Sequence, residues 1–150
     1  MAKVFIYPGT SLILSDLVSR FGHRPLGSAL AVREKVQTAG LDSPPLQITS
    51  EDPKKGLRFA AVEVPSGVRG RMSLHGPQID EADAGIIIQD ADLAFGCMGC
   101  ARTNELVRFL LHRRDIPILE LTYPHSDEEG IRFVAAIKEF LSSLAGGEAK

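Results

Sequence analysis

The chain has 150 residues, of which 44% are hydrophobic and 24% are charged, as in an ordinary globular protein with a substantial core. Its 17 basic and 19 acidic residues give a net charge of −2, and with few aromatic residues and no tryptophan this argues against nucleic-acid binding. No apolar run reaches the roughly 18 residues of a membrane span, and the first residues lack a signal-peptide pattern, so we expect a cytoplasmic protein.

The chain begins with a pattern typical of a strand followed by a helix. Residues 3–7 favour a strand, and a Pro-Gly pair ends it. Thr10 or Ser11 can cap a helix whose apolar residues follow helical spacing, and Gly22 fits the end of that helix. Such a strand–loop–helix unit is a common opening of a parallel α/β sheet.

The middle of the chain is less regular. A weaker helical pattern covers residues 26–39, and a β-hairpin is predicted over residues 46–64 around a polar turn. Glycines and prolines predict a long exposed loop over residues 65–77. A short helix at 78–84 is then predicted to run into a strand at 85–88.

The last third alternates more clearly between strands and helices. Strands are predicted at 91–95 and 116–123, and helices at about 103–113 and 127–144, the latter capped by Ser126 or its neighbour. This alternation predicts a single α/β domain over residues 1–150, in three layers, with a mostly parallel sheet flanked by helices as in Rossmann-like or flavodoxin-like folds. The last residues, 146–150, are predicted to form a loose tail.

Three loops follow predicted strands, and we expect all three at the carboxyl edge of the sheet, where α/β proteins bind ligands. They are residues 8–11, 96–100 and 123–126. The candidate cofactor-binding residues in the first and third loops are Gly9, Thr10, Ser11 and His125. The first three also suit a plain turn with a helix cap, and His125, also a candidate base, suits an exposed loop residue. No phosphate-binding glycine motif supports nucleotide binding.

The middle loop carries both cysteines of the chain, Cys97 and Cys100, as a Cys-x-x-Cys pair. Their predicted place between a strand and a helix favours reactive thiols, because backbone N–H groups and the positive end of the helix dipole stabilise a thiolate. They are too close in sequence to form a structural disulfide framework. We therefore favour a functional thiol pair over an inert one, with Cys97 as the attacking thiol. The motif comes too late in the chain for a thioredoxin fold.

A metal site is the rival interpretation of Cys97 and Cys100. Zinc and iron–sulfur clusters usually take four protein ligands, and this loop supplies two. The missing ligands would come from a partner chain, for example from a second copy in a symmetric homodimer. His75 or His125 could also contribute, although neither has a recognisable metal-binding spacing. The sequence identifies no other cofactor.

Three segments resemble methanogenesis marker protein 5, a family of methanogenic archaea. They are Lys3-Val-Phe-Ile-Tyr-Pro-Gly-Thr-Ser11, Gly22-His-Arg-Pro25 and Gly96-Cys-Met-Gly-Cys-Ala-Arg-Thr-Asn-Glu-Leu106. The resemblance spans nearly the whole chain. It implies an anaerobic cytoplasm and protein partners in the methyl-coenzyme M reductase system, and it assigns no catalytic residue.

The leading functional hypothesis is an accessory protein that assists maturation or activation of methyl-coenzyme M reductase through protein contacts and the thiol pair. The chain shows no complete set of catalytic residues, which favours a role other than that of a self-contained enzyme. The alternatives are a thiol–disulfide oxidoreductase, a metal or iron–sulfur site shared between two chains, and small-molecule binding at the carboxyl edge.

Overall fold

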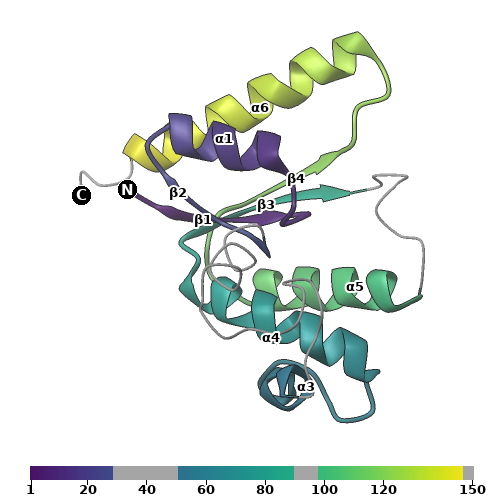
Figure 1. Cartoon of the computed structure of the whole chain (residues 1–150). Coiled ribbons are helices and arrows are strands. Elements are labelled where there is room, and N and C mark those ends of the chain that lie inside the picture. The colour runs from purple at the N-terminus through teal and green to yellow at the C-terminus, as the bar shows by residue number, and fades with distance from the viewer. Residues whose placement is uncertain (29–50, 90–97, 147–150) are drawn as a thin grey trace, which may run out of the picture.

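The computed structural model describes residues 1–28, 51–89 and 98–146. Within these ranges, four parallel strands form one sheet in the order β2-β1-β3-β4, which confirms the predicted α/β class (Figure 1). The strands are β1 (Lys3–Tyr7), β2 (Arg24–Leu26), β3 (Ala84–Gln89) and β4 (Ile118–Thr122). The helices are α1 (Leu12–Arg20), α3 (Asp52–Lys55), the 3₁₀ helix η1 (Gly56–Arg58), α4 (Ser66–Glu81), α5 (Met98–His112) and α6 (Asp127–Gly146).

Helices cover both faces of the sheet, so the domain has three layers (Figure 1). Alternate side chains of β1 enter two separate cores, since successive residues of a strand point to opposite faces. Phe5 and Tyr7 pack with α4 and α5, whereas Val4 and Ile6 pack with α1 and α6. This burial on both faces explains the continuous apolar run at the start of the chain.

The ends of α1 are set by the residues expected from the sequence. The Ser11 hydroxyl accepts a hydrogen bond from the Leu14 N–H at 3.3 Å, which caps the first turn. Gly22 ends the helix with a φ of +77°, a conformation that glycine adopts without strain. Likewise, Ser126 caps α6 through a 3.2 Å bond from the Glu129 N–H.

His23 connects the two ends of the chain. The ring is buried; its Nδ1 accepts a hydrogen bond from the Ala2 N–H at 3.2 Å, and its Nε2 lies 2.9 Å from the Leu141 carbonyl oxygen in α6. Pro25 follows on β2, at the edge of the sheet, where a missing N–H is tolerated. Each part of the Gly22-His-Arg-Pro25 segment therefore has a structural role: Gly22 ends a helix, the buried His23 hydrogen-bonds near both ends of the chain, and Pro25 lies on an edge strand.

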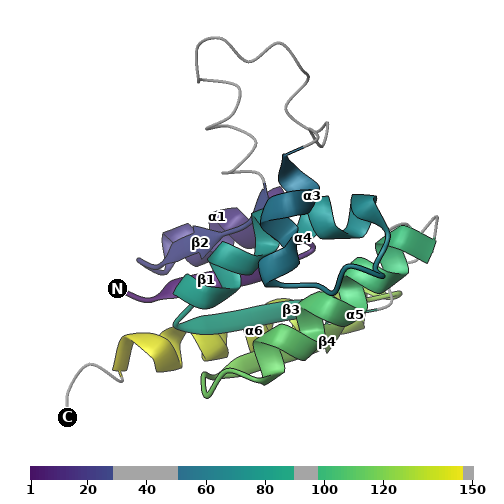
Figure 2. The same ribbon diagram turned by 90° about the horizontal axis from the view of Figure 1, so that it is seen from below.

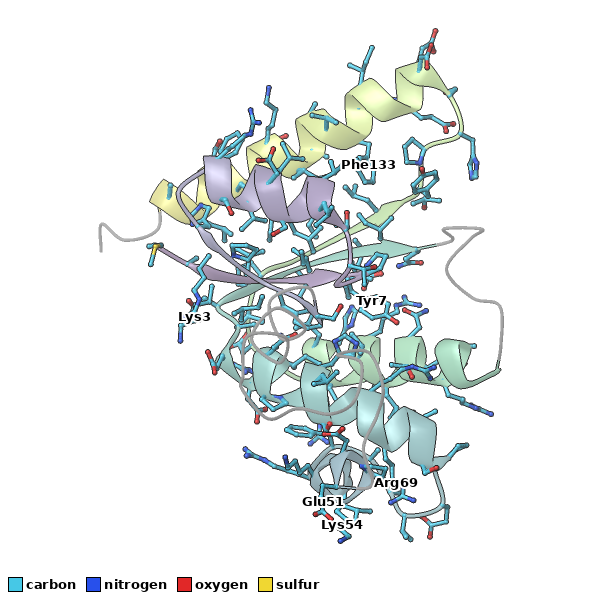
Figure 3. The ribbon with its side chains drawn as sticks, in the orientation of Figure 1. Lys3, Tyr7, Glu51, Lys54, Arg69 and Phe133 are labelled. Carbon is cyan, nitrogen blue, oxygen red and sulfur yellow. The ribbon has the colours of Figure 1, made fainter. Side chains whose placement is uncertain are left out.

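The predicted β-hairpin over 46–64 is wrong in its described part, because residues 52–58 are helical and no strand follows them up to residue 64. The cause is packing against α4 (Figure 2). A side chain at Gly56 would overlap the backbone of Arg69, so this short helical segment contacts α4 directly. Arg69 strengthens the contact by donating to the Val64 and Pro53 carbonyl oxygens at 3.1 and 3.3 Å (Figure 3).

The predicted loop at 65–77 is also wrong, because these residues form most of α4. Pro65 occupies the cap position, where it does not disturb the helix, and Gly76 lets the ring of Phe59 pack directly on the helix backbone. Gly76 therefore serves close packing rather than a loop. The short helix predicted at 78–84 is the end of this longer one, and the strand predicted at 85–88 is β3.

Three further boundaries differ from the prediction. The helix expected from residue 26 does not start there, because Leu26 pairs with Phe5 as part of β2, and residues 29–50 lie outside the described part. The helix expected from 103 begins at Met98, and α6 includes Gly146, the first residue of the expected tail. The strand predicted at 91–95 lies outside the described residues. Among the helices that are described, none has the length and apolar character needed to cross a bilayer.

Candidate functional site

The topology singles out the carboxyl ends of β1 and β3. The chain leaves β1 toward β2 on one side of the sheet, and it leaves β3 toward β4 on the other side (Figure 1). Connections that diverge in this way open a crevice between the two strands, and such crevices are the usual ligand sites of parallel α/β sheets. The loops at 8–11 and 123–126 both leave this edge, because β1 and β4 run parallel on either side of β3.

The loop after β1 is a tight turn in close contact with the segment after β2. The Ser11 N–H donates to the Pro8 carbonyl oxygen at 3.1 Å. A side-chain carbon at Gly9 would lie 2.7 Å from the Ser28 nitrogen, and one at Gly27 would lie 2.8 Å from the Gly9 oxygen. Of the three candidates here, Gly9 is buried in this contact, Thr10 is exposed, and Ser11 caps α1.

The loop after β4 carries His125, whose ring is exposed. Its backbone N–H donates to Glu129 Oε2 at 2.8 Å, and its ring packs edge-on against Tyr123 with centroids 6.2 Å apart. The Tyr123 N–H donates to the Gln89 carbonyl oxygen at 3.1 Å, which extends the β3–β4 pairing by one residue. His125 therefore lies on the outer side of this loop, beside α6.

A small apolar hollow lies between the two loops. It measures about 130 Å³ and is lined by Pro8 and Ser11 of the first loop, Ile88 of β3, Tyr123, and Phe133 of α6. Figure 3 labels Phe133 on α6. His125 is not among its lining residues. Typical pockets for drug-sized ligands have about 300–1,000 Å³, so the hollow suits a small apolar group rather than a nucleotide.

Of the two cysteines, only Cys100 lies among the described residues, as the third residue of α5. Since α5 follows β3, its first turn begins close in sequence to the carboxyl end of that strand. The first-turn backbone N–H groups of a helix have no partner within the helix, and they stabilise negative charge. The first turn of α5 contains no acidic residue that would oppose this effect. Cys97 lies outside the described residues.

His75 lies in α4, under the carboxyl half of β1. Its ring is 8% exposed and contacts the rings of Phe5 and Tyr7 edge-on, with centroids 6.2 and 5.8 Å away. Burial lowers the pKa of His75 to about 4, and the positive charge of Arg71 adds to this effect. The imidazole is therefore neutral at physiological pH, and its buried Nδ1 has no hydrogen-bond partner among the described residues.

A second polar group surrounds Glu120 of β4. Arg108 of α5 donates to Glu120 Oε2 at 3.2 Å, and the Gln89 side chain donates to the same oxygen. The Nε2 of His112 lies 2.6 Å from Glu120 Oε1 without hydrogen-bond alignment, so these two residues form an ion pair only when His112 is protonated. Sequence reasoning missed Glu120 and considered His75 only as a possible metal ligand, because no local spacing connects a helix residue with a side chain on a distant strand.

Over residues 1–28, 51–89 and 98–146, no three His, Cys, Asp or Glu side chains are placed together so that they could hold a metal ion. Neither His75 nor His125 therefore belongs to such a group within these ranges. A metal at the cysteines would need ligands from outside the described residues.

Residues 2–144 match the protein family described as "Uncharacterized protein conserved in archaea (DUF2112)". The chain belongs to this family. It is 58% identical over 144 residues to a protein of Methanocaldococcus jannaschii described as "Uncharacterized protein MJ0404", and the alignment covers 96% of each chain. None of the solved structures matches the chain significantly. The family match and the alignment with this relative both include the sheet, its flanking helices and the carboxyl edge.

Proposed function

We propose that this protein is an accessory factor that acts on a partner protein through the thiols of Cys97 and Cys100. The observation that carries the proposal is the start of α5 at Met98, which places Cys100 in the first turn of a 15-residue helix. The dipole and the N–H groups at the start of a helix stabilise a thiolate, and Cys97 directly precedes Met98 in the sequence, so we expect both thiols to ionise more readily than a core cysteine.

The need for a partner follows from what surrounds the carboxyl edge. Ser11 is engaged as a helix cap, His75 is sealed in the core, and the His125 ring lies outside the hollow. Within the described residues, this edge thus lacks the nucleophile, base and orienting group of a self-contained hydrolase or transferase. The thiols supply the reactive groups, and the substrate surface comes from another protein.

Methyl-coenzyme M reductase maturation or activation is the setting we propose for this factor. The resemblance to methanogenesis marker protein 5 supports it, and so does a 58% identical relative in a methanogen. Methanogens live under anaerobic, reducing conditions, where a dithiol stays reduced and available for exchange.

The chemistry we propose is thiol–disulfide exchange. The Cys97 thiolate attacks one sulfur of a partner disulfide, which forms a mixed disulfide and releases the partner's other sulfur as a thiolate. Cys100 then loses its proton and attacks the mixed bond. The partner leaves as a dithiol, having gained two electrons, and Cys97 and Cys100 remain joined as a disulfide.

A trapping experiment tests this function. The Cys100→Ser variant forms the mixed disulfide and lacks the thiol that resolves it, so an anaerobic affinity purification followed by non-reducing electrophoresis should recover a covalent adduct with a subunit or activation factor of methyl-coenzyme M reductase. The Cys97→Ser, Cys100→Ser double variant is the matched control and should recover none. Equal recovery from both variants, or adducts only with unrelated proteins, would refute the proposal. Stoichiometric iron or zinc in the anaerobically purified wild type would favour the shared metal site.

A further inference from the structure

One side of α6 exposes apolar residues that the core does not use. Ile137 and Leu141 are fully buried against the sheet and α1, whereas Ile131 is 71% exposed and Val134 is 39% exposed. Both line an open groove of about 930 Å³ that also includes Pro124 and Lys138. Ile131 and Val134 are three residues apart on the helix, so their exposed side chains adjoin one another and form one small apolar patch.

The exposed side of α6 carries a stripe of four residues, Asp127, Ile131, Val134 and Lys138. At 100° per residue they lie within about 60° of one another around the helix, so they form one line along its surface. The order along the stripe is acid, apolar, apolar, base. The spacings of four, three and four residues read the same in both directions.

This symmetry makes the stripe complementary to itself. When a second α6 is placed antiparallel, residue i faces residue 265 − i, so Asp127 faces Lys138 and Ile131 faces Val134. The two-fold axis repeats each contact, which gives two ion pairs around a central cluster of four apolar side chains. Spacings of three and four residues are those at which antiparallel helices interdigitate.

We propose that the protein forms a homodimer through antiparallel packing of this α6 stripe against the same stripe of a second copy. The charge pattern favours a second copy because one stripe supplies both members of each ion pair. Asp127 and Lys138 are both exposed and enter none of the ion pairs formed within the described residues. A net charge of −2 adds little repulsion between copies. This inference does not depend on the thiol chemistry proposed above.

The stripe is about three turns long, so the dimer buries less than the roughly 800 Å² per partner of a standard interface. We therefore expect reversible dimerisation with a dissociation constant in the micromolar range or weaker. The association should weaken with added salt, since the two ion pairs lie at the solvent-exposed rim.

Charge-reversal variants of the full chain test the pairing, measured by sedimentation velocity across a concentration series. Asp127→Lys and Lys138→Glu each place like charges opposite one another, and each should weaken self-association on the order of 10- to 100-fold. Mixing these two variants restores both ion pairs, so the mixture should associate about as well as the wild type. Glu139→Lys lies on the same helix about 110° from the stripe and should leave association unchanged.

Circular dichroism establishes that each variant is folded before it is compared. A wild type that stays monomeric up to about 1 mM would overturn the proposal, because such weak affinity falls below that of specific interfaces. So would single variants that associate as tightly as the wild type, or folded variants that fail to associate when mixed. Ile131→Asp gives a second measurement, since it removes the apolar centre and should abolish dimerisation with the ion pairs still present.

Discussion

Replacing His75 with glutamine should change how the stability of this protein depends on pH. In the native state the ring lies between Phe5, Tyr7 and the body of α4, and burial together with Arg71 lowers its pKa to about 4. In the unfolded chain the same group has its ordinary pKa of 6.5. Between pH 4 and 6.5 the unfolded state therefore binds more protons than the native state. The free energy of unfolding rises with pH through this window, and it falls as acid is added.

The size of the effect follows from the two pKa values. Each tenfold difference in proton affinity is worth about 1.4 kcal/mol, so protonation of His75 in the unfolded state should cost the wild type about 3 kcal/mol between pH 6.5 and pH 4. The His75→Gln variant lacks this loss. Glutamine also gives up the aromatic contacts, so the variant should be less stable at pH 7 by about 1 to 2 kcal/mol. The two stability curves should therefore converge or cross as the pH falls toward 4.

Urea unfolding followed by circular dichroism at several pH values between 4 and 7 measures both curves. Ile79→Val is the matched control, because it destabilises the same helix without removing a titrating group, and its curve should run parallel to that of the wild type. If the difference between wild type and His75→Gln stays constant across this range, His75 does not titrate as its burial requires, and the reasoning fails.

Four other substitutions can be measured by the same unfolding experiment at pH 7. Gly76→Ala forces a methyl group into the ring of Phe59 and should destabilise by about 1 to 3 kcal/mol, whereas Gly67→Ala, in open space on the same helix, should be neutral or stabilise by up to about 1 kcal/mol. Equal effects would contradict the close packing of α3 and η1 on α4. Ser126→Ala removes the cap of α6 and should lower the free energy of unfolding by about 1 kcal/mol. An unchanged free energy of unfolding would contradict a stabilising role for the cap. Glu120→Ala leaves the half-buried Arg108 without its carboxylate partner and should lower the free energy of unfolding by about 1 to 3 kcal/mol. A variant as stable as the wild type would show that the polar side chains around Glu120 contribute nothing to stability.

Local patterns were sufficient where one residue decides the conformation. The sequence narrows each helix cap to two neighbours, and Ser11 and Ser126 are the members that cap, because a hydroxyl at that position satisfies an N–H of its own helix. Gly22 was identified as a helix end for a similar reason, since a positive φ favours glycine whatever surrounds it. The alternation of strands and helices predicted a parallel sheet, because parallel strands need crossover connections.

Local patterns failed between residues 51 and 77, where the conformation depends on a neighbour distant in sequence. Gly56 falls within the predicted turn and Gly76 within the predicted loop. In the structure, Gly56 is where its own segment meets the backbone of α4, and Gly76 is where a phenylalanine ring packs on α4. In a sequence, a glycine that permits a turn cannot be told from one that permits a close contact with another element. Only the packed structure distinguishes the two, because the distinguishing atom belongs to another element.

For the candidate site as well, some features could be predicted from the sequence and others were decided only by the packed structure. The sequence alone predicted a Cys97–Cys100 thiol pair near the start of a helix, and two other loops at the same edge of the sheet. Tertiary structure decided that α5 begins at Met98 and that His75 is sealed beneath β1. It also decided which side of α6 remains uncovered. Spacing along the chain specifies which residues share one face of an element, whereas burial depends on what packs against that face.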